Sequence, residues 1–179
     1  MKMLIGALAL SLMSATAHTN QLPQTISHSK GEFQLCDKER VSKLWFDIVD
    51  VGIYYPSCDT VQHIFDNQTK LLRFAYLREV EGQQFTKGAI EYLEQNLNPQ
   101  ELEYCSEHFS PLNHVYKDVT EGDYYDLYLF EDEGLTLYLN GKHLHDMPSK
   151  ECHTPYLNVW FGEETMDSQF HDLSKRLKR

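Results

Sequence analysis

Residues 40–56 carry the clearest hydrophobic pattern in the chain. The run is rich in β-branched and aromatic residues and stops at Pro56, which is typical of a β-strand. Apolar residues occupy both parities of the alternation, so both faces of this strand should be covered. At roughly 3.3 Å per residue an unbroken strand would extend about 50 Å, so we expect a bulge or bend near residues 47–50. The two sets are Leu44, Phe46 and Ile48 on one parity, and Trp45, Val49, Val51 and Ile53 on the other.

Shorter patterns predict the remaining elements of a single domain. Apolar residues at helical spacing predict a helix over residues 85–96 and a tail helix over residues 166–177. Between them, Asn98 followed by Pro99 and Glu101 has the residues of a helix N-terminus with a capping box. Asn140-Gly141 predicts a tight turn. Strands are predicted at residues 33–36, 71–77, 124–130 and 135–140, the last two joined around residues 131–134.

The first 17 residues predict a secretory signal peptide. Lys2 precedes an apolar run over residues 4–12, and the small residues Ala15 and Ala17 suit cleavage before His18. The run is too short to anchor the chain in a bilayer, and no later segment reaches membrane length. We therefore expect export, to a bacterial periplasm, without a stable membrane anchor. Residues 18–30 are predicted to be a flexible leader, and residues 31–179 the folded domain.

Charge limits the partners that the chain can have. The 179 residues include 16 Lys and Arg against 27 Asp and Glu, a formal net charge of -11. A chain of this size buries one good core. No basic stripe or polybasic helix offsets the negative charge, which argues against nucleic acid and against an anionic membrane surface as partners.

The four cysteines should form two disulfides if the chain reaches an oxidising compartment. Four cysteines allow three pairings. Cys36 precedes the predicted long strand and Cys58 follows it, so a straight strand would hold their Cα atoms far beyond the roughly 7 Å limit for a bridge. This ranks Cys36 with Cys58 last and leaves the choice between two pairings open: Cys36 with Cys105 and Cys58 with Cys152, or the crossed alternative.

The sequence resembles the chalcone isomerase-like family in four blocks that follow one another in the family's order. The resemblance implies an α+β fold, in which an antiparallel β-sheet is backed by helices on one face as an open-faced sandwich. It also implies a cleft that binds a flat or long apolar molecule. The blocks are residues 40–56, Tyr76 to Phe85, Glu121 to Tyr128, and Leu137 to Gly141 together with Val159 to Gly162.

The same resemblance assigns a role to four positions. In the plant enzymes an arginine, a threonine, a tyrosine and an asparagine form the polar part of the site. By alignment of the blocks, Arg40 takes the arginine position, whereas Val49, Phe85 and Tyr92 take the positions of the other three. A developing oxyanion needs hydrogen-bond donors aimed at it, each worth about 3 kcal/mol, and valine and phenylalanine offer none. Efficient isomerase chemistry is therefore disfavoured.

We interpret these residues as an apolar slot with one cation. Phe85 and Tyr92 lie seven residues apart on the predicted helix and so share a face, opposite Arg40 and Val49. Such a slot suits a fatty or aromatic acid bound through its carboxylate or phenolate. Two alternatives stay open: a residual chalcone-type isomerase, and a structural or protein-interaction module in which Arg40 pairs with acidic neighbours. Arg40 and Val49 lie an odd number of residues apart, so only a bulge would place both in one cleft.

No motif indicates a cofactor or a metal. His143 and His145 alternate on a predicted strand and His153 follows, but no third ligand stands at a fixed interval. No nucleophile elbow of the Gly-x-Ser-x-Gly type occurs either. We therefore expect no cofactor and no metal site.

Overall fold

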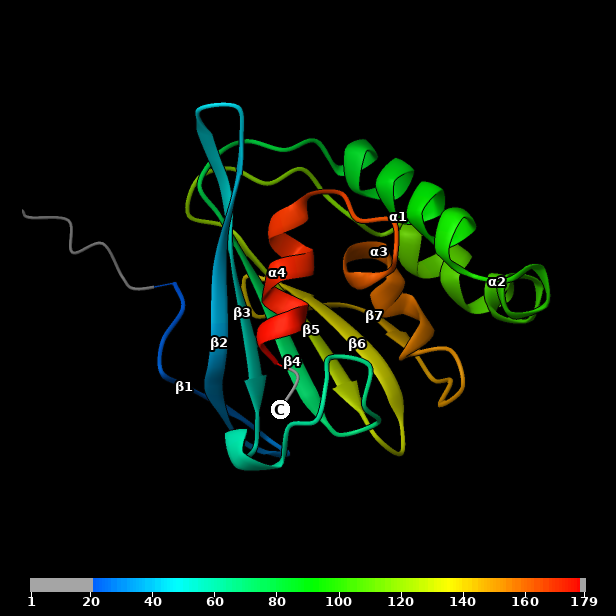
Figure 1. Ribbon diagram of the computed structural model, residues 1–179, viewed down its shortest axis with the longest axis horizontal. Coiled ribbons are helices and arrows are strands. Elements are labelled where there is room, and N and C mark those ends of the chain that lie inside the picture. The colour runs from blue at the N-terminus through cyan, green and yellow to red at the C-terminus, as the bar shows by residue number, and fades with distance from the viewer. Residues whose placement is uncertain (1–20, 178–179) are drawn as a thin grey trace, which may run out of the picture.

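The computed structural model describes residues 21–177, so the predicted signal peptide and residues 18–20 lie outside it. Seven antiparallel strands form one sheet whose spatial order is the order along the chain, as Figure 1 shows. Strands that are consecutive in the chain are thus antiparallel neighbours in the sheet, and this confirms the predicted α+β fold with an antiparallel sheet. The strands are β1 (Thr25–His28), β2 (Gly31–Lys43), β3 (Phe46–Tyr55), β4 (Lys70–Tyr76), β5 (Tyr124–Phe130), β6 (Gly134–Leu139) and β7 (Lys142–Met147).

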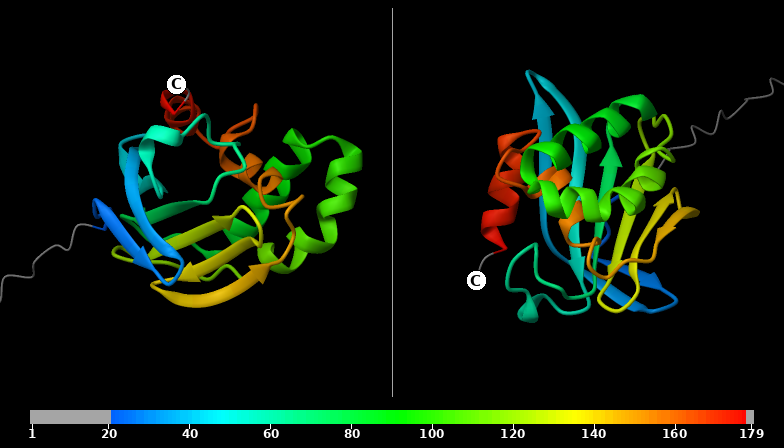
Figure 2. Two further views of the ribbon diagram at one scale, coloured as in Figure 1. Left: turned by 90° about the horizontal axis from the view of Figure 1, so that it is seen from below. Right: turned by 90° about the vertical axis from the view of Figure 1, so that its right-hand side faces the viewer.

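The sheet curls, and helices fill its concave face (Figures 1 and 2). The first two helices follow one another directly. Asn98 caps the second of them, because its side-chain oxygen accepts a hydrogen bond from the Glu101 amide at 2.9 Å, as the capping pattern predicts. None of the helices between residues 21 and 177 is both long and apolar enough to cross a membrane. The helices are α1 (Gly82–Asn96), α2 (Pro99–Asn113), α3 (Asn158–Phe161) and α4 (Ser168–Arg176).

The segment predicted as one long strand is a β-hairpin. Strands β2 and β3 pair antiparallel, and Lys43 opposite Phe46 is the pair next to the turn. Leu44 and Trp45 form the turn itself. The expected irregularity near residues 47–50 is present as a shift of register where Val41 pairs with Val49 and Ser42 with Asp47. The prediction missed the turn because Leu44 and Trp45 carry none of the residues that favour two-residue turns, such as Asn-Gly.

The hairpin also overturns the predicted disulfides. Cys36 lies in β2 and Cys58 directly after β3, so the antiparallel return brings their Cα atoms to 5.3 Å and the two form a bridge. The second bridge joins Cys105 to Cys152, with Cα atoms 5.6 Å apart. The pairing that we ranked last is therefore the one that forms, because the ranking assumed a single straight strand between the first two cysteines.

The N-terminal boundary of the domain is also earlier than predicted. Residues 25–28, assigned to a flexible leader, form β1, which pairs with β2. The ring of His28 lies 4.5 Å from that of Tyr128 on β5, so this end of the chain folds across the convex face of the sheet. A small second core forms there. Its buried residues are Ile26, Phe33, Tyr54, Leu71, Tyr128 and Phe130.

The main core lies between the concave face and the helices. Val51 and Ile53 of β3 are fully buried in it, whereas Tyr54, on the opposite parity, is fully buried in the second core. Strand β3 is therefore covered on both faces, as its apolar pattern predicts. Burial on both faces fixes the register of the sheet, because a slip of one residue would exchange the two faces.

Candidate functional site

An apolar cavity of about 340 Å³ lies between the concave face of the sheet and helices α1, α3 and α4. This volume is within the range of pockets that hold small molecules. The sheet supplies one wall because alternate residues of its strands point inward, and the helices supply the other. The apolar and aromatic lining includes Val41, Val49, Phe74, Tyr76, Leu127 and Leu137 from the sheet, Phe85, Ala89 and Tyr92 from α1, Val159 and Trp160 from α3, and Phe170 from α4.

Four aromatic rings that contact one another form one part of the cavity wall. Tyr76 of β4 and Tyr125 of β5 stand edge-on to each other with ring centroids 6.0 Å apart, and both pack against Phe85 of α1 at 5.4 and 5.7 Å. Tyr116 lies 5.6 Å from Phe85 and 5.3 Å from Tyr125. Edge-on contacts of this kind hold the rings in fixed orientations. These contacts fix the orientation of the rings that the cavity wall presents.

Of the three tyrosine hydroxyls in this group of rings, two already form hydrogen bonds with other groups of the protein. The Tyr125 hydroxyl accepts a hydrogen bond from the Lys117 amide at 2.7 Å and donates one to the Lys117 carbonyl at 3.0 Å. The Tyr116 hydroxyl lies 3.1 Å from the Tyr156 hydroxyl. Because the Tyr156 hydroxyl donates its hydrogen to the Asn113 side-chain oxygen at 2.7 Å, Tyr116 is the donor in the contact between the two tyrosines. These bonds anchor the rings from behind.

Tyr76 differs from its neighbours in one respect. Among the hydrogen bonds of residues 21–177, none uses its hydroxyl, although the residue is buried against the cavity. Burial raises the pKa of Tyr76 well above its ordinary value, and the neighbouring Tyr116 and Tyr125 raise it further. Burial likewise raises the pKa of Tyr125 to about 12. Near neutral pH these phenols are therefore protonated, so they can donate hydrogen bonds but cannot act as bases.

The cavity opens between the β2–β3 hairpin, the first turns of α1 and the residues before α4. Lys43 and Gln84 are exposed at this mouth, and Asp167 is half-buried there. The Asp167 carboxylate caps α4 by accepting a hydrogen bond from the Gln169 amide at 3.1 Å. Lys43 is the cation among the lining residues that the structure describes.

The structure brings three of the four predicted residues to this cavity. Val49 of β3 lies on the sheet side, and Phe85 and Tyr92 lie on one face of α1, as their spacing of seven residues indicates. The slot between the strand and the helix is therefore present. Its role in binding stays a prediction.

Arg40 does not line the cavity, which corrects the predicted position of the cation. Its Nε and Nη2 atoms bind the two oxygens of Asp50 at 2.7 and 2.9 Å, and Nη1 binds Asp47 at 3.0 Å. Arg40 pairs across the hairpin with Asp50, whereas Val41, its neighbour, pairs with Val49. Alternation along β2 therefore turns Arg40 away from the face that carries Val49, and the irregularity beyond Val41 does not restore it.

The prediction missed Lys43, Tyr76, Tyr116 and Trp160, all of which line the cavity. The signal for Lys43 was present, since it lies two residues after Val41 and shares its face. The histidines form a different arrangement: His143 lies 3.0 Å from the Asp146 carboxylate on β7. Over residues 21–177 no three side chains of His, Cys, Asp or Glu gather closely enough to hold a metal.

The curled sheet with an apolar cavity under its helices defines an α+β domain of the open-faced sandwich type. The family model described as chalcone isomerase-like matches residues 14–173, so the chain belongs to that family. The crystal structure of the Arabidopsis thaliana fatty-acid binding protein AtFAP1 is similar, with a TM-score of 0.59 and 16% identity over 87% of this chain and 92% of that chain. This likeness shows a shared fold. No curated protein sequence gives a significant match.

Proposed function

We propose that the protein is an exported, non-catalytic binding protein for an apolar acid, either a fatty acid or an aromatic acid. The observation that carries the proposal is the cavity itself, about 340 Å³ in volume with walls that are mainly apolar and aromatic. Burial of apolar ligand surface there contributes about 25 cal/mol per Å² before the costs of association. The similarity in fold to a plant fatty-acid binding protein agrees with this proposal.

The acid group of the ligand lies at the mouth, beside Lys43. An ionised carboxylate deep in the cavity would lose its hydration without meeting a cation, which is very costly. The hydroxyls of Tyr116 and Tyr125 are already bonded to other groups of the protein, whereas the mouth is open to water and carries the Lys43 ammonium group. The apolar body of the ligand then extends inward past Tyr76 and Phe85 toward Phe74, Leu127 and Trp160.

The aromatic rings of the cavity wall also give a criterion between the two classes of acid. Flat aromatic ligands can stack or stand edge-on against rings such as Phe85 and Tyr125, whereas an alkyl chain gains there only the free energy of burying its apolar surface. The unused Tyr76 hydroxyl can donate to an oxygen on the body of an aromatic ligand. A hydroxylated aromatic acid therefore gains a hydrogen bond that a fatty acid does not, which favours the aromatic class.

Catalysis of the chalcone isomerase type is not part of the proposal. Val49 and Phe85 offer no donor, and the buried phenols of Tyr76 and Tyr125 are held protonated near neutral pH. The export that we propose agrees with the two disulfides, since bridges persist in oxidising compartments such as the periplasm.

Calorimetric titration tests the binding proposal. We expect saturable binding of a cinnamic-type acid and of a long-chain fatty acid. The 4-hydroxylated cinnamic acid should bind more tightly than the parent acid, and this difference in affinity should be lost in Tyr76→Phe. Native mass spectrometry of protein purified from its own periplasm should show a copurified acid. If the wild type binds no acid and carries no copurified molecule, the proposal fails and the protein-interaction module becomes the better interpretation.

A further inference from the structure

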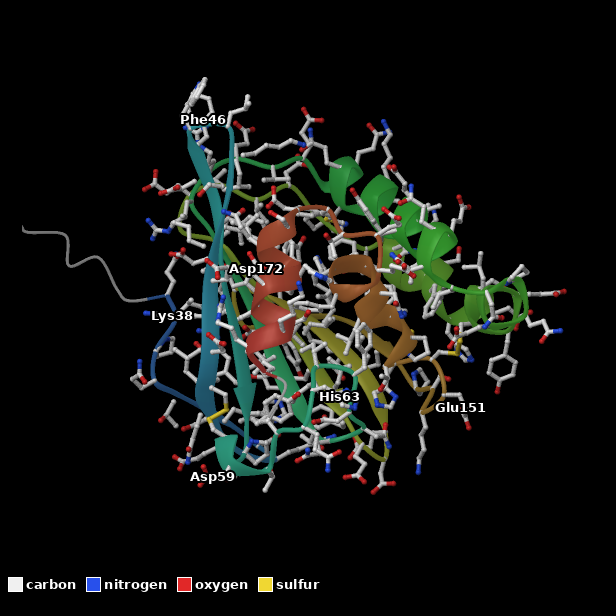
Figure 3. All side chains as sticks on the ribbon, viewed as in Figure 1. Lys38, Phe46, Asp59, His63, Glu151 and Asp172 are labelled. Atoms are coloured by element: carbon white, nitrogen blue, oxygen red, sulfur yellow. A yellow bond between two sulfur atoms is a disulfide. The ribbon has the colours of Figure 1, made fainter. Side chains whose placement is uncertain are left out.

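The turn of the β2–β3 hairpin carries an unusual group of exposed apolar side chains. Leu44 is 80% exposed, Trp45 is 86% exposed and Phe46 is 46% exposed. The hairpin projects beyond the rest of the fold in Figure 1, and Figure 3 shows Phe46 at its far end. We call Leu44, Trp45 and Phe46 the hairpin tip. Single exposed apolar residues are common on soluble proteins, but three consecutive ones at a protruding point require an explanation.

The backbone of the tip is not explained by turn chemistry. Leu44 has φ of 59°, in the left-handed region where a side chain with a Cβ atom is strained. Two-residue hairpin turns normally place Asn or Gly at such a position. Leucine at this position of the turn therefore opposes local stability. Strained positions of this kind are found where a side chain has a function outside the fold.

The hairpin tip lies next to the mouth of the cavity. Lys43 precedes the turn and Ile48 follows the tip by two residues, and both line the cavity. Leu44, Trp45 and Phe46 themselves are not part of the lining. A surface that receives the tip would therefore face the mouth directly, without contributing to the walls of the pocket.

We propose that the hairpin tip inserts into the surface of a zwitterionic lipid bilayer and holds the cavity mouth against it. Tryptophan is enriched at the level of the lipid headgroups, because its ring is apolar and its N–H is polar. Leu44 and Phe46 extend the apolar part. The Arg78 guanidinium lies 4.2 Å from the Phe46 ring centroid, so it and Lys43 stand where lipid phosphates would meet them while the apolar ring passes below.

The shape and charge of the protein decide between a bilayer and other occupants. A stable contact with a second copy or another protein buries about 1,200 Å² or more in total, and a narrow two-stranded tip presents too little surface for that. A bilayer needs no matching surface, since the tip enters it. The net charge of -11 opposes approach to anionic lipid, so insertion of apolar side chains, and not electrostatic adsorption, drives the contact.

The consequence is an exchange route for an apolar ligand. A molecule dissolved in the bilayer can pass between the lipid and the cavity at the mouth without crossing bulk water. This goes beyond ligand binding as such, because the tip contributes no cavity wall and insertion does not depend on which acid is bound.

Vesicle flotation with the full mature chain tests the inference. The informative variant is Leu44→Asn with Trp45→Gly, because Asn-Gly suits a turn with positive φ and should keep or raise the melting temperature. The matched control is Tyr104→Ser, which removes an aromatic side chain that is 63% exposed on α2. With vesicles of phosphatidylcholine and phosphatidylethanolamine we expect the wild type and the control to float, and the double variant to lose at least tenfold in partitioning.

Quenching by brominated lipids adds a direct readout of insertion. The chain has two tryptophans, so Trp160→Phe leaves Trp45 as the reporter, and its emission should shift to the blue and be quenched by vesicles. No flotation of the wild type, equal losses in the double variant and the control, or binding only when anionic lipid is added would each overturn the inference. A concentration-dependent dimer that the double variant abolishes, without vesicle binding, would assign the tip to a second copy instead.

The same double variant separates this inference from the proposed function. Its affinity for a soluble acid should equal that of the wild type, because Leu44 and Trp45 lie outside the lining. If the wild type floats but binds no acid, the binding proposal fails and the bilayer contact stands. If it binds acid but does not float, only the bilayer contact fails.

Discussion

Two cations on β2, three residues apart, give a matched test of how the ligand is held. Arg40 was the predicted anchor, and its guanidinium is bonded to Asp50 and Asp47 on the face that does not form the cavity. Lys43 lines the mouth. Replacement of each by glutamine removes one positive charge from the same strand. We expect Lys43→Gln to weaken the binding of an acid and Arg40→Gln to leave it unchanged.

The size of the effect follows from the exposure of Lys43. A charge-assisted hydrogen bond in desolvated surroundings contributes roughly 1.5–3 kcal/mol, but an ion pair in contact with water contributes only about 0.2–1 kcal/mol. Because Lys43 is exposed at the rim, the second range applies. The acid should therefore bind about 1.4-fold to 5-fold more weakly in Lys43→Gln at low salt. The difference should shrink at high ionic strength, where surface charges are screened.

Asp167 supplies the opposite sign at the same mouth. Its carboxylate repels a bound acid, and Asp167→Asn removes the charge while asparagine still caps α4. The acid should bind slightly more tightly in this variant. The assay is isothermal titration of one acid and of its primary amide, which has the same body and no charge. The amide should bind all four proteins, the wild type included, with equal affinity.

Two results would refute this account of the mouth. If Arg40→Gln weakens the acid more than Lys43→Gln does, the arginine reaches the ligand and the face assignment on β2 is wrong. If Lys43→Gln weakens acid and amide equally, the loss comes from a change in the shape of the mouth and not from charge. In the second case the acid group would lie elsewhere, and the orientation that we propose would be reversed.

Further predictions concern the disulfides, catalysis and a buried ion pair. Intact-mass measurement of exported protein should show loss of about two hydrogens for each bridge, and four alkylatable thiols would contradict both bridges. The double variant Cys105→Ser with Cys152→Ser should lose about 2–5 kcal/mol of unfolding free energy. A 2′-hydroxychalcone should cyclise no faster than spontaneously in a stopped-flow absorbance assay, and saturable turnover of about 1 per second would contradict this. Lys70 is buried and donates to the Asp66 carboxylate at 2.7 Å, so Lys70→Met should cost about 3–5 kcal/mol in urea denaturation. Burial opposes ionisation of Asp66, but the hydrogen bond and charge of Lys70 outweigh it and lower the pKa of Asp66 below 3.8. The ionised Asp66 therefore stabilises the fold near neutral pH, and this stabilisation is lost as the pH falls through the lowered pKa. The pH dependence should be absent in Asp66→Asn.

The sequence by itself determined the local elements and the face of one helix. Strand alternation and helix caps depend on neighbours within a few residues, so β4, β5 and β6 lie close to their predicted ranges and α2 begins where its capping residues predict. The spacing of Phe85 and Tyr92 was enough to place both on one side of α1, and the structure brings them to the cavity. The family resemblance supplied the sheet that this helix covers.

Only the tertiary structure decided where the chain reverses between residues 40 and 56, and three outcomes depend on that reversal. It brings Cys36 to Cys58, turns Arg40 away from the cavity, and places Lys43 at the mouth. No local signal marks the turn, because Leu44 adopts a backbone conformation that leucine disfavours. The pairing of β2 with β3 overrides this local preference, since the hydrogen bonds and buried side chains of the whole hairpin outweigh the strain at one residue.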